Sequence, residues 1–185
     1  MKNVIRYSAV ILLILIIHSC KKDEVSNTVT DIDGNVYKTV TIGTQIWMGE
    51  NLKTTRYNNG DLIGTTNPAT LDISSEATPK YQWAYEGNES YVNPYGRLYT
   101  WYTITDSRNV CPTGWHVPTS AEWASLIAYL GGESVAGGKL KETSTTHWAS
   151  PNTGATNESG FTALPGGFRS NVCIFIEKGY YGCWW

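Results

Sequence analysis

Short runs rich in β-branched residues alternate with turn residues over residues 29–57. Runs of this length with a period of two predict half-buried strands. Asp33-Gly34 separates the first run from residues 36–42, and Gly43-Thr44 separates that run from residues 45–48. Asp-Gly between two such runs is typical of a type I′ hairpin turn, which requires positive φ at both central residues. The pattern predicts an N-terminal β-meander.

A helical pattern stands in the second half of the chain. Thr119, with Glu122 three residues later, has the sequence of a capping box, and Gly131-Gly132 supplies a stop signal. The apolar residues between them recur at helical spacing, at Trp123, Leu126, Ile127 and Leu130. The spacing predicts a helix over residues 120–130.

The remaining segments have weaker patterns. Residues 58–94 are rich in Asn, Gly, Thr, Ser and Pro, which predicts long loops around one strand near residues 81–85. Residues 95–103 carry aromatic residues at spacings that suit a short helix and equally permit a strand. Residues 136–142 and 160–169 are predicted to form short strands and tight turns. The chain is therefore predicted to be α+β.

The first two dozen residues have the pattern of a bacterial lipoprotein signal. Lys2 and Arg6 give a positive start, residues 10–17 are an unbroken apolar run, and Ser19 precedes Cys20. The pattern predicts cleavage before Cys20 and lipidation of its thiol, with ordinary secretion as the main alternative. A transmembrane helix would need about 20 predominantly apolar residues, more than this run provides.

We therefore expect a lipoprotein signal peptide at residues 1–19, a tether at residues 20–28 and a single domain at residues 29–185. Two or three acyl chains on Cys20 would hold the chain to a membrane, because each buried methylene contributes about 0.8 kcal/mol. Lys-Lys-Asp-Glu at residues 21–24 is similar to export signals of Bacteroidetes lipoproteins. The expected location is the outer membrane with the domain at the cell surface; a periplasm-facing anchor is the alternative.

The composition argues against one class of partner for this chain and indicates which residues form its core. Removing residues 1–19 takes away Lys2 and Arg6 from the 14 basic residues and leaves 12 against 16 acidic ones. Nothing in this balance suggests nucleic acid, which requires a basic patch. A chain rich in Gly, Thr, Asn, Trp and Tyr is typical of a loop-rich extracytoplasmic domain. Aromatic residues must then supply much of the core.

Cysteine and histidine are the first places to look for chemistry. Cys111, Cys173 and Cys183 are disulfide candidates because disulfides persist outside the cytoplasm, but an odd number leaves one without a partner. They form no Cys-x-x-Cys pair, the pattern of redox enzymes. His116 lies in no Ser/His/Asp arrangement, and with Cys111 it supplies at most two of the ligands that zinc needs. We expect a structural role for His116, and for His147 no separate function is indicated.

Calcium is the one metal for which the loops offer candidate ligands. Hard cations bind oxygen atoms from carboxylates, amides and backbone carbonyls. Asn152, Asn157 and Glu158 are candidates, and Asp31 and Asp33 are further ones. The alternative, which we prefer, is that these residues form turns, because their short side chains bond nearby backbone amides. On that interpretation no cofactor is expected.

Aromatic residues in glycine-rich loops suggest a second kind of site, because exposed rings can stack on sugars. The loop candidates are Tyr57, Tyr85, Tyr91 and Tyr180. The alternative is packing into the core, which we prefer for a domain with so few aliphatic residues.

Four blocks of the chain form a family pattern. They are Ile-Gly-Thr-Gln-Ile-Trp at the start of residues 42–52, Tyr-Gly-Arg-Leu-Tyr in residues 95–102, Cys-Pro-Thr-Gly-Trp-His-Val-Pro in residues 111–119, and residues 154–169. In this order they resemble the Fibrobacter succinogenes major paralogous domain. Such domains sit on lipoproteins and secreted proteins of Bacteroidetes and Fibrobacteres, and the resemblance covers essentially all of residues 29–185.

The resemblance implies a fold, and it shows one departure of this sequence from the family pattern. The family is similar to the C-type lectin-like and formylglycine-generating-enzyme-like fold, with short irregular antiparallel strands, two short helices and long loops. The resemblance also implies core positions for the tryptophans that fit the family's blocks, Trp47, Trp101, Trp115 and Trp123. Members of the family continue beyond the Gly-x-Trp-Trp block to a Val-Arg-Cys motif, whereas this sequence stops at Trp184-Trp185. The resemblance thus implies a C-terminally truncated domain, and it makes the absent cysteine the expected partner of Cys111.

Three functional hypotheses follow. The first is a lipid-anchored cell-surface module without catalytic activity, which either recognises a glycan or a protein or has a structural role. The second, by fold analogy, is a formylglycine-generating-enzyme-like oxidoreductase, which would need a partly exposed cysteine of lowered pKa. The third is a truncated paralogue without function.

Overall fold

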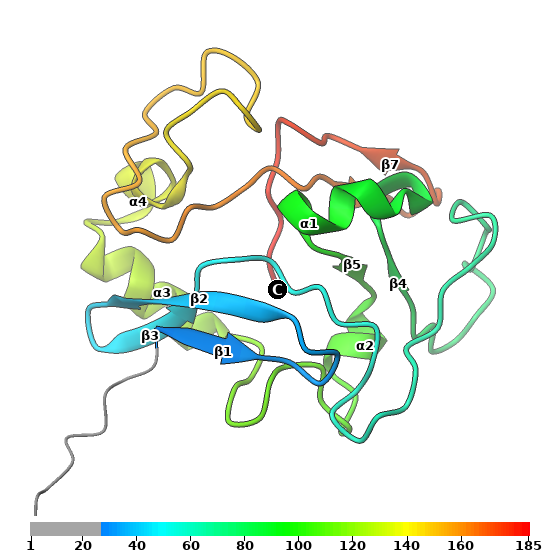
Figure 1. Cartoon of the computed structure of the whole chain (residues 1–185). Coiled ribbons are helices and arrows are strands. Elements are labelled where there is room, and N and C mark those ends of the chain that lie inside the picture. Colours follow the sequence, from blue (N-terminus) through cyan, green and yellow to red (C-terminus); the bar gives the residue numbers. More distant parts are fainter. Residues whose placement is uncertain (1–26) are drawn as a thin grey trace, which may run out of the picture.

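The computed structural model describes residues 27–185 (Figure 1). The predicted signal peptide, the lipidation site Cys20 and most of the predicted tether lie outside the described residues. Within residues 27–185, the longest helices fall well short of what a bilayer crossing requires in length and apolar character. The fold is mixed α+β, with short antiparallel strands and few helices, so the predicted fold class is confirmed at that level.

The N-terminal β-meander is confirmed. Strands β1 (Thr28–Thr30), β2 (Val36–Ile42) and β3 (Gln45–Met48) form an antiparallel sheet in the order β1-β2-β3. Thr28, which the sequence assigned to the tether, pairs with Lys38 as the first residue of β1.

The first hairpin turn differs from the predicted type I′ turn. Gly34 has a φ of 83°, but Asp33 is not among the residues of positive φ in the described chain. The turn spans five residues because the carboxylate of Asp31 organises it. Asp31 Oδ1 accepts hydrogen bonds from the backbone N–H groups of Asp33 (3.0 Å) and Asn35 (2.9 Å), and Oδ2 accepts one from the hydroxyl of Tyr37.

The middle of the chain forms a second, smaller sheet. β4 (Gln82–Trp83) confirms the strand predicted near residues 81–85, and it pairs with β5 (Leu98–Tyr99). Residues 95–103 are neither one helix nor one strand, because β5 is followed at once by the one-turn helix α2 (Trp101–Ile104). Between β4 and β5 run three short helices, η1 (Tyr85–Gly87), η2 (Glu89–Tyr91) and α1 (Val92–Tyr95).

The predicted long helix is confirmed with its cap. α3 spans Ser120–Tyr129, the Thr119 hydroxyl accepts a hydrogen bond from Glu122 N–H, and the Glu122 carboxylate accepts one from Thr119 N–H. Gly131 and Gly132 follow it with φ values of 101° and 98°. Such left-handed conformations suit glycine and end the helix.

The strands and turns predicted over residues 136–142 are wrong, because α4 (Glu133–Leu140) occupies this segment. Gly137 and Gly138 lower its helix propensity, but tertiary packing favours glycine here. A Cβ atom on Gly138 would lie 2.2 Å from the carbonyl oxygen of Gly154. The prediction of short strands for residues 160–169 is confirmed by β6 (Phe168–Arg169), which pairs with β7 (Phe175–Ile176).

Aromatic residues do supply much of the core, in three clusters. One joins the meander to α3 and α4, a second lies around Tyr57 and Ile104, and a third surrounds Trp83 and Phe175. Trp47 is buried, and Trp115 and Trp123 are partly buried against these clusters. The core prediction is wrong for Trp101, which is 55% exposed.

Gly96 offers a test of how closely two segments approach each other. Its φ is 70°, and an added Cβ would lie 2.5 Å from Asn51 Cβ and 2.8 Å from the Leu52 carbonyl oxygen. Gly96→Ala should therefore lower the free energy of unfolding by about 1–3 kcal/mol more than a glycine-to-alanine change whose only cost is the positive φ. Gly60→Ala is the control, because Gly60 has a φ of 91° and open space around it. Urea unfolding of both variants measures the difference, and equal losses would contradict the close approach.

Candidate binding cleft

An open cleft of about 1130 Å³ lies at the centre of the described part of the molecule. One wall is formed by all of β3 and the residues after it, and the other by β5 and the start of α2. The start of α3, the loop over residues 110–118, β6 and the C-terminal residues complete it. Figure 1 shows the C-terminal segment, in red, ending between the N-terminal sheet and β5.

The floor of the cleft is aromatic. The rings of Trp47 and Trp123 lie 4.8 Å apart between centroids, and Phe161 meets both rings edge-on. Aromatic pairs at such distances stabilise each other beyond their burial alone. Trp101 pairs with Trp185 at 5.6 Å, and both are about half exposed. The cleft therefore presents large apolar surface to whatever enters it.

The C-terminal dipeptide of the sequence already occupies part of the cleft. Trp184 Nε1 donates a hydrogen bond to Asn51 Oδ1 (2.9 Å), and its ring meets Phe161 edge-on. The backbone oxygen of Trp185 accepts a hydrogen bond from Trp123 Nε1 (2.8 Å). The cleft thus holds polypeptide by aromatic packing together with hydrogen bonds to side chains.

One polar atom at the floor has no partner. Trp47 Nε1 is buried and makes no hydrogen bond within residues 27–185, although Trp47 lines the cleft. Buried donors are nearly always paired in native structures, because an unpaired one costs about 1–3 kcal/mol. An acceptor on a ligand would remove this cost.

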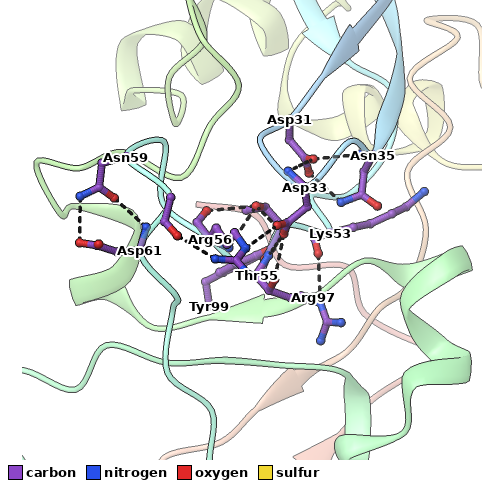
Figure 2. Close-up of polar contacts among 12 residues, drawn as sticks. Asp31, Asp33, Asn35, Lys53, Thr55, Arg56, Asn59, Asp61, Arg97 and Tyr99 are labelled. Atoms are coloured by element: carbon purple, nitrogen blue, oxygen red, sulfur yellow. Dashed lines mark hydrogen bonds and ion pairs between the residues drawn. The ribbon is translucent and has the colours of Figure 1, made fainter.

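A polar network supports the wall that follows β3 (Figure 2). Asp33 Oδ2 accepts hydrogen bonds from the backbone N–H (2.6 Å) and hydroxyl (2.9 Å) of Thr55, and Oδ1 lies 3.3 Å from Arg56 Nε. Partial burial by itself raises the pKa of Asp33, but these bonds outweigh it and hold the pKa below its usual value. The carboxylate therefore fixes residues 54–56 to the first hairpin.

The other wall is fixed through Arg97 and Tyr99. Arg97 Nε donates to the Lys53 carbonyl (3.0 Å), and its other nitrogens bond Gln82 and Glu89. The Tyr99 hydroxyl donates to the Thr54 carbonyl (2.8 Å), and burial raises the pKa of this phenol well above its usual value. Both side chains tie β5 to residues 53–54, so the two walls have a fixed relative position.

His116 and Glu122 stand on the rim of the cleft. His116 Nε2 lies 2.8 Å from Glu122 Oε1, so its partner is a side-chain carboxylate. Hydrogen bonds from the Thr119 backbone and hydroxyl, and then from His116, lower the pKa of Glu122 to about 2. His147 lies elsewhere, with Nδ1 2.9 Å from Glu142 Oε1.

The three disulfide candidates all line the cleft as free thiols. Cys111 and Cys173 are buried, whereas Cys183 is exposed. Burial raises the pKa of Cys111 to about 11 and also raises the pKa of Cys183. Raised pKa values are the opposite of what a reactive thiolate requires.

The calcium candidates sit in separate networks. Asn152 Nδ2 donates to the carbonyls of Glu142 (2.7 Å) and Ser144 (2.9 Å), and the Asn157 side chain bonds Thr162. Glu158 pairs with Lys139 at 3.3 Å. Asp31 and Asp33 lie in the hairpin network described above. Across residues 27–185, no three His, Cys, Asp or Glu side chains gather as a metal-binding group.

Of the tyrosines considered for sugar stacking, Tyr57 and Tyr85 are buried in the core, as the packing alternative predicted. Tyr91 is partly buried and Tyr180 is exposed, but neither lines the cleft. Sequence reasoning missed the cleft itself and the position of Trp184 and Trp185 within it. The run Gly-x-Trp-Trp was a visible signal, because two adjacent tryptophans are costly to leave in water.

Fold and cleft together define a small α+β module whose prominent feature is a cleft lined by aromatic residues. The chain belongs to the Fibrobacter succinogenes major domain family, whose model matches residues 40–185 and so confirms the resemblance. No curated protein matches the chain. No solved structure matches it either.

The lowered pKa of Glu122 predicts a pH dependence of stability. Because its folded pKa of about 2 lies below the usual 4.5, ionised Glu122 stabilises the fold above pH 4.5, and this contribution disappears as the pH falls towards 2. Glu122→Ala should lower the urea midpoint above pH 4.5 and match the wild type near pH 2. Glu133→Ala, in the first turn of α4, is the control. The same pH-dependent difference in both variants would refute a specific role of the capping box.

Proposed function

We propose that the protein is a lipid-anchored cell-surface module that binds an extended polypeptide segment of a partner protein in the aromatic cleft, without catalysis. The observation that carries this proposal is the chain's own Trp184–Trp185, seated in the cleft by ring packing and by hydrogen bonds from Trp123 and to Asn51. The cleft therefore already accommodates the kind of ligand that we propose.

The size and lining of the cleft favour a polypeptide over a small molecule or a glycan. Small-ligand pockets have volumes of about 300–1,000 Å³, and this cleft, at about 1130 Å³, is larger and open. Trp47 and Phe161 are buried in contact with Trp123, so the floor is packed apolar surface and not a set of exposed rings that could stack on a sugar. Apolar side chains of a peptide match that floor better.

The thiols support a binding role over the oxidoreductase alternative. Of the three cysteines in the described chain, Cys111 is buried with a pKa of about 11, and Cys183 also has a raised pKa. Cys173 is buried beside Asp72, with its sulfur 3.8 Å from a carboxylate oxygen. A nucleophilic cysteine needs an exposed thiolate stabilised by positive charge, and these surroundings do not supply one.

We also propose that the fold is C-type lectin-like. A C-type lectin-like arrangement is supported by the short antiparallel sheets, by the two longer helices α3 and α4 on one side, and by the long loops between them (Figure 1). In that arrangement, binding through loops and strand ends around a central cleft is a natural use of the fold.

The lipid anchor is tested at Cys20. We expect mass spectrometry of the N-terminal peptide to show that it begins at Cys20 and carries acyl chains. Cys20→Ser should abolish this modification, because the acceptor thiol is gone, whereas Cys183→Ser should leave it intact. An unmodified N-terminus in the wild-type chain would refute the anchor.

The binding proposal is tested with a random-peptide library panned against the full chain in detergent. We expect enrichment of peptides rich in large apolar residues. Trp101→Ala removes an exposed ring from the mouth of the cleft and should weaken binding of the enriched peptide about tenfold, equivalent to about 1.4 kcal/mol. Tyr180→Ala removes an exposed ring elsewhere and should leave the affinity unchanged. Binding that survives Trp101→Ala, or enrichment of oligosaccharides alone on a glycan array, would refute the proposal.

A further inference from the structure

The side of β3 that faces the cleft is an open strand edge. Gly49 N–H donates to the Lys38 carbonyl (2.9 Å), which fixes the phase of the ladder between β2 and β3. Paired groups alternate along an antiparallel ladder. The backbone N–H and C=O groups of Trp47 therefore bond to β2, whereas those of Ile46 and Met48 point away from β2. Among residues 27–185, no strand or bridge pairs with that side of β3.

The wall formed by β5 also has backbone groups that point away from its partner strand. Thr100 N–H donates to the Tyr81 carbonyl (3.1 Å), so alternation along the pair β4–β5 turns the backbone groups of Tyr99 away from β4. The walls meet where Arg97 N–H donates to the Leu52 carbonyl (2.9 Å). The cleft is therefore a gap between two strand edges that is closed at one end by a hydrogen bond.

We infer that the partner segment enters this gap as a β-strand and pairs with the outer edge of β3 through the backbone groups of Ile46 and Met48. The inference rests on the proposed function and adds the mode of binding to it. Strand addition satisfies backbone groups that neither a helix nor a glycan could pair in register, because a helix uses its backbone groups internally.

The floor of the gap defines the chemistry of the strand. Alternate side chains of a strand point to one face, so every second residue meets Trp47, Trp123 and Phe161 and should be large and apolar. Residues of the other phase face solvent and should be polar. Trp184 and Trp185 provide the local precedent, since their rings pack against the cleft while the backbone oxygen of Trp185 accepts a hydrogen bond.

The first experiment uses the peptide enriched from the library, methylated at one backbone nitrogen at a time. In a strand paired with β3, alternate N–H groups face that edge. Methylation should therefore weaken binding about tenfold or more at every second residue of the paired stretch and have little effect at the residues between. If methylation has the same small effect at every position, while Trp101→Ala still abolishes binding, the strand-addition inference is wrong. The proposal that the cleft binds a polypeptide would then still hold. If no peptide is enriched, the proposed function and the inference both fail.

The second experiment alters the protein edge. Ile46→Pro removes the N–H that points into the cleft without removing a ladder hydrogen bond, and proline is tolerated at such edge positions. Ile46→Thr is the matched control, because it changes the half-exposed side chain but keeps the N–H. We expect at least about a tenfold loss of peptide affinity in Ile46→Pro and near-wild-type affinity in Ile46→Thr, with similar urea midpoints. Equal affinity in both variants would overturn the inference, and the methylation scan decides the matter if Ile46→Pro does not fold.

Discussion

The contact between residues 51–52 and residues 96–97 is the constraint on which the rest of the structure depends. Gly96 approaches Asn51 so closely that no side chain fits, and Arg97 N–H donates to the Leu52 carbonyl (2.9 Å). This junction joins the N-terminal sheet to the pair β4–β5 and sets where the cleft closes. Asn51 extends it, because its amide group bonds Tyr95 on one side and Trp184 on the other. Two small sheets with separate cores thereby act as one body.

Features set by neighbouring residues could be predicted from the sequence. The capping box of Thr119 and Glu122 is a local exchange of hydrogen bonds, so four residues suffice to specify the start of α3. The meander followed from period-two runs separated by glycine-containing turns. The blocks around Trp47, Gly96 and Trp115 were enough to indicate the family that the chain belongs to.

Features set by distant residues could not be predicted. α4 contains Gly137 and Gly138 against its propensity, and for Gly138 the reason lies in the close approach of Gly154 across the fold. Similarly, the cleft brings together Trp47, Trp101 and Trp185, which are far apart in the chain and share no spacing rule. Their roles also differ, since one ring is core and the others are exposed, and only the tertiary contacts decide which.

The position of β3 within a recess has a consequence for how copies of the protein meet one another. An open strand edge on the outside of a molecule invites the edge of a neighbouring copy, which is a common route to aggregation. Here the free groups of Ile46 and Met48 line a cleft whose other wall is β5 and whose mouth carries Trp101 and Trp185. These walls would obstruct the edge of another folded sheet more than a single extended chain. The recessed position of β3 would then limit edge-to-edge pairing between copies of the protein.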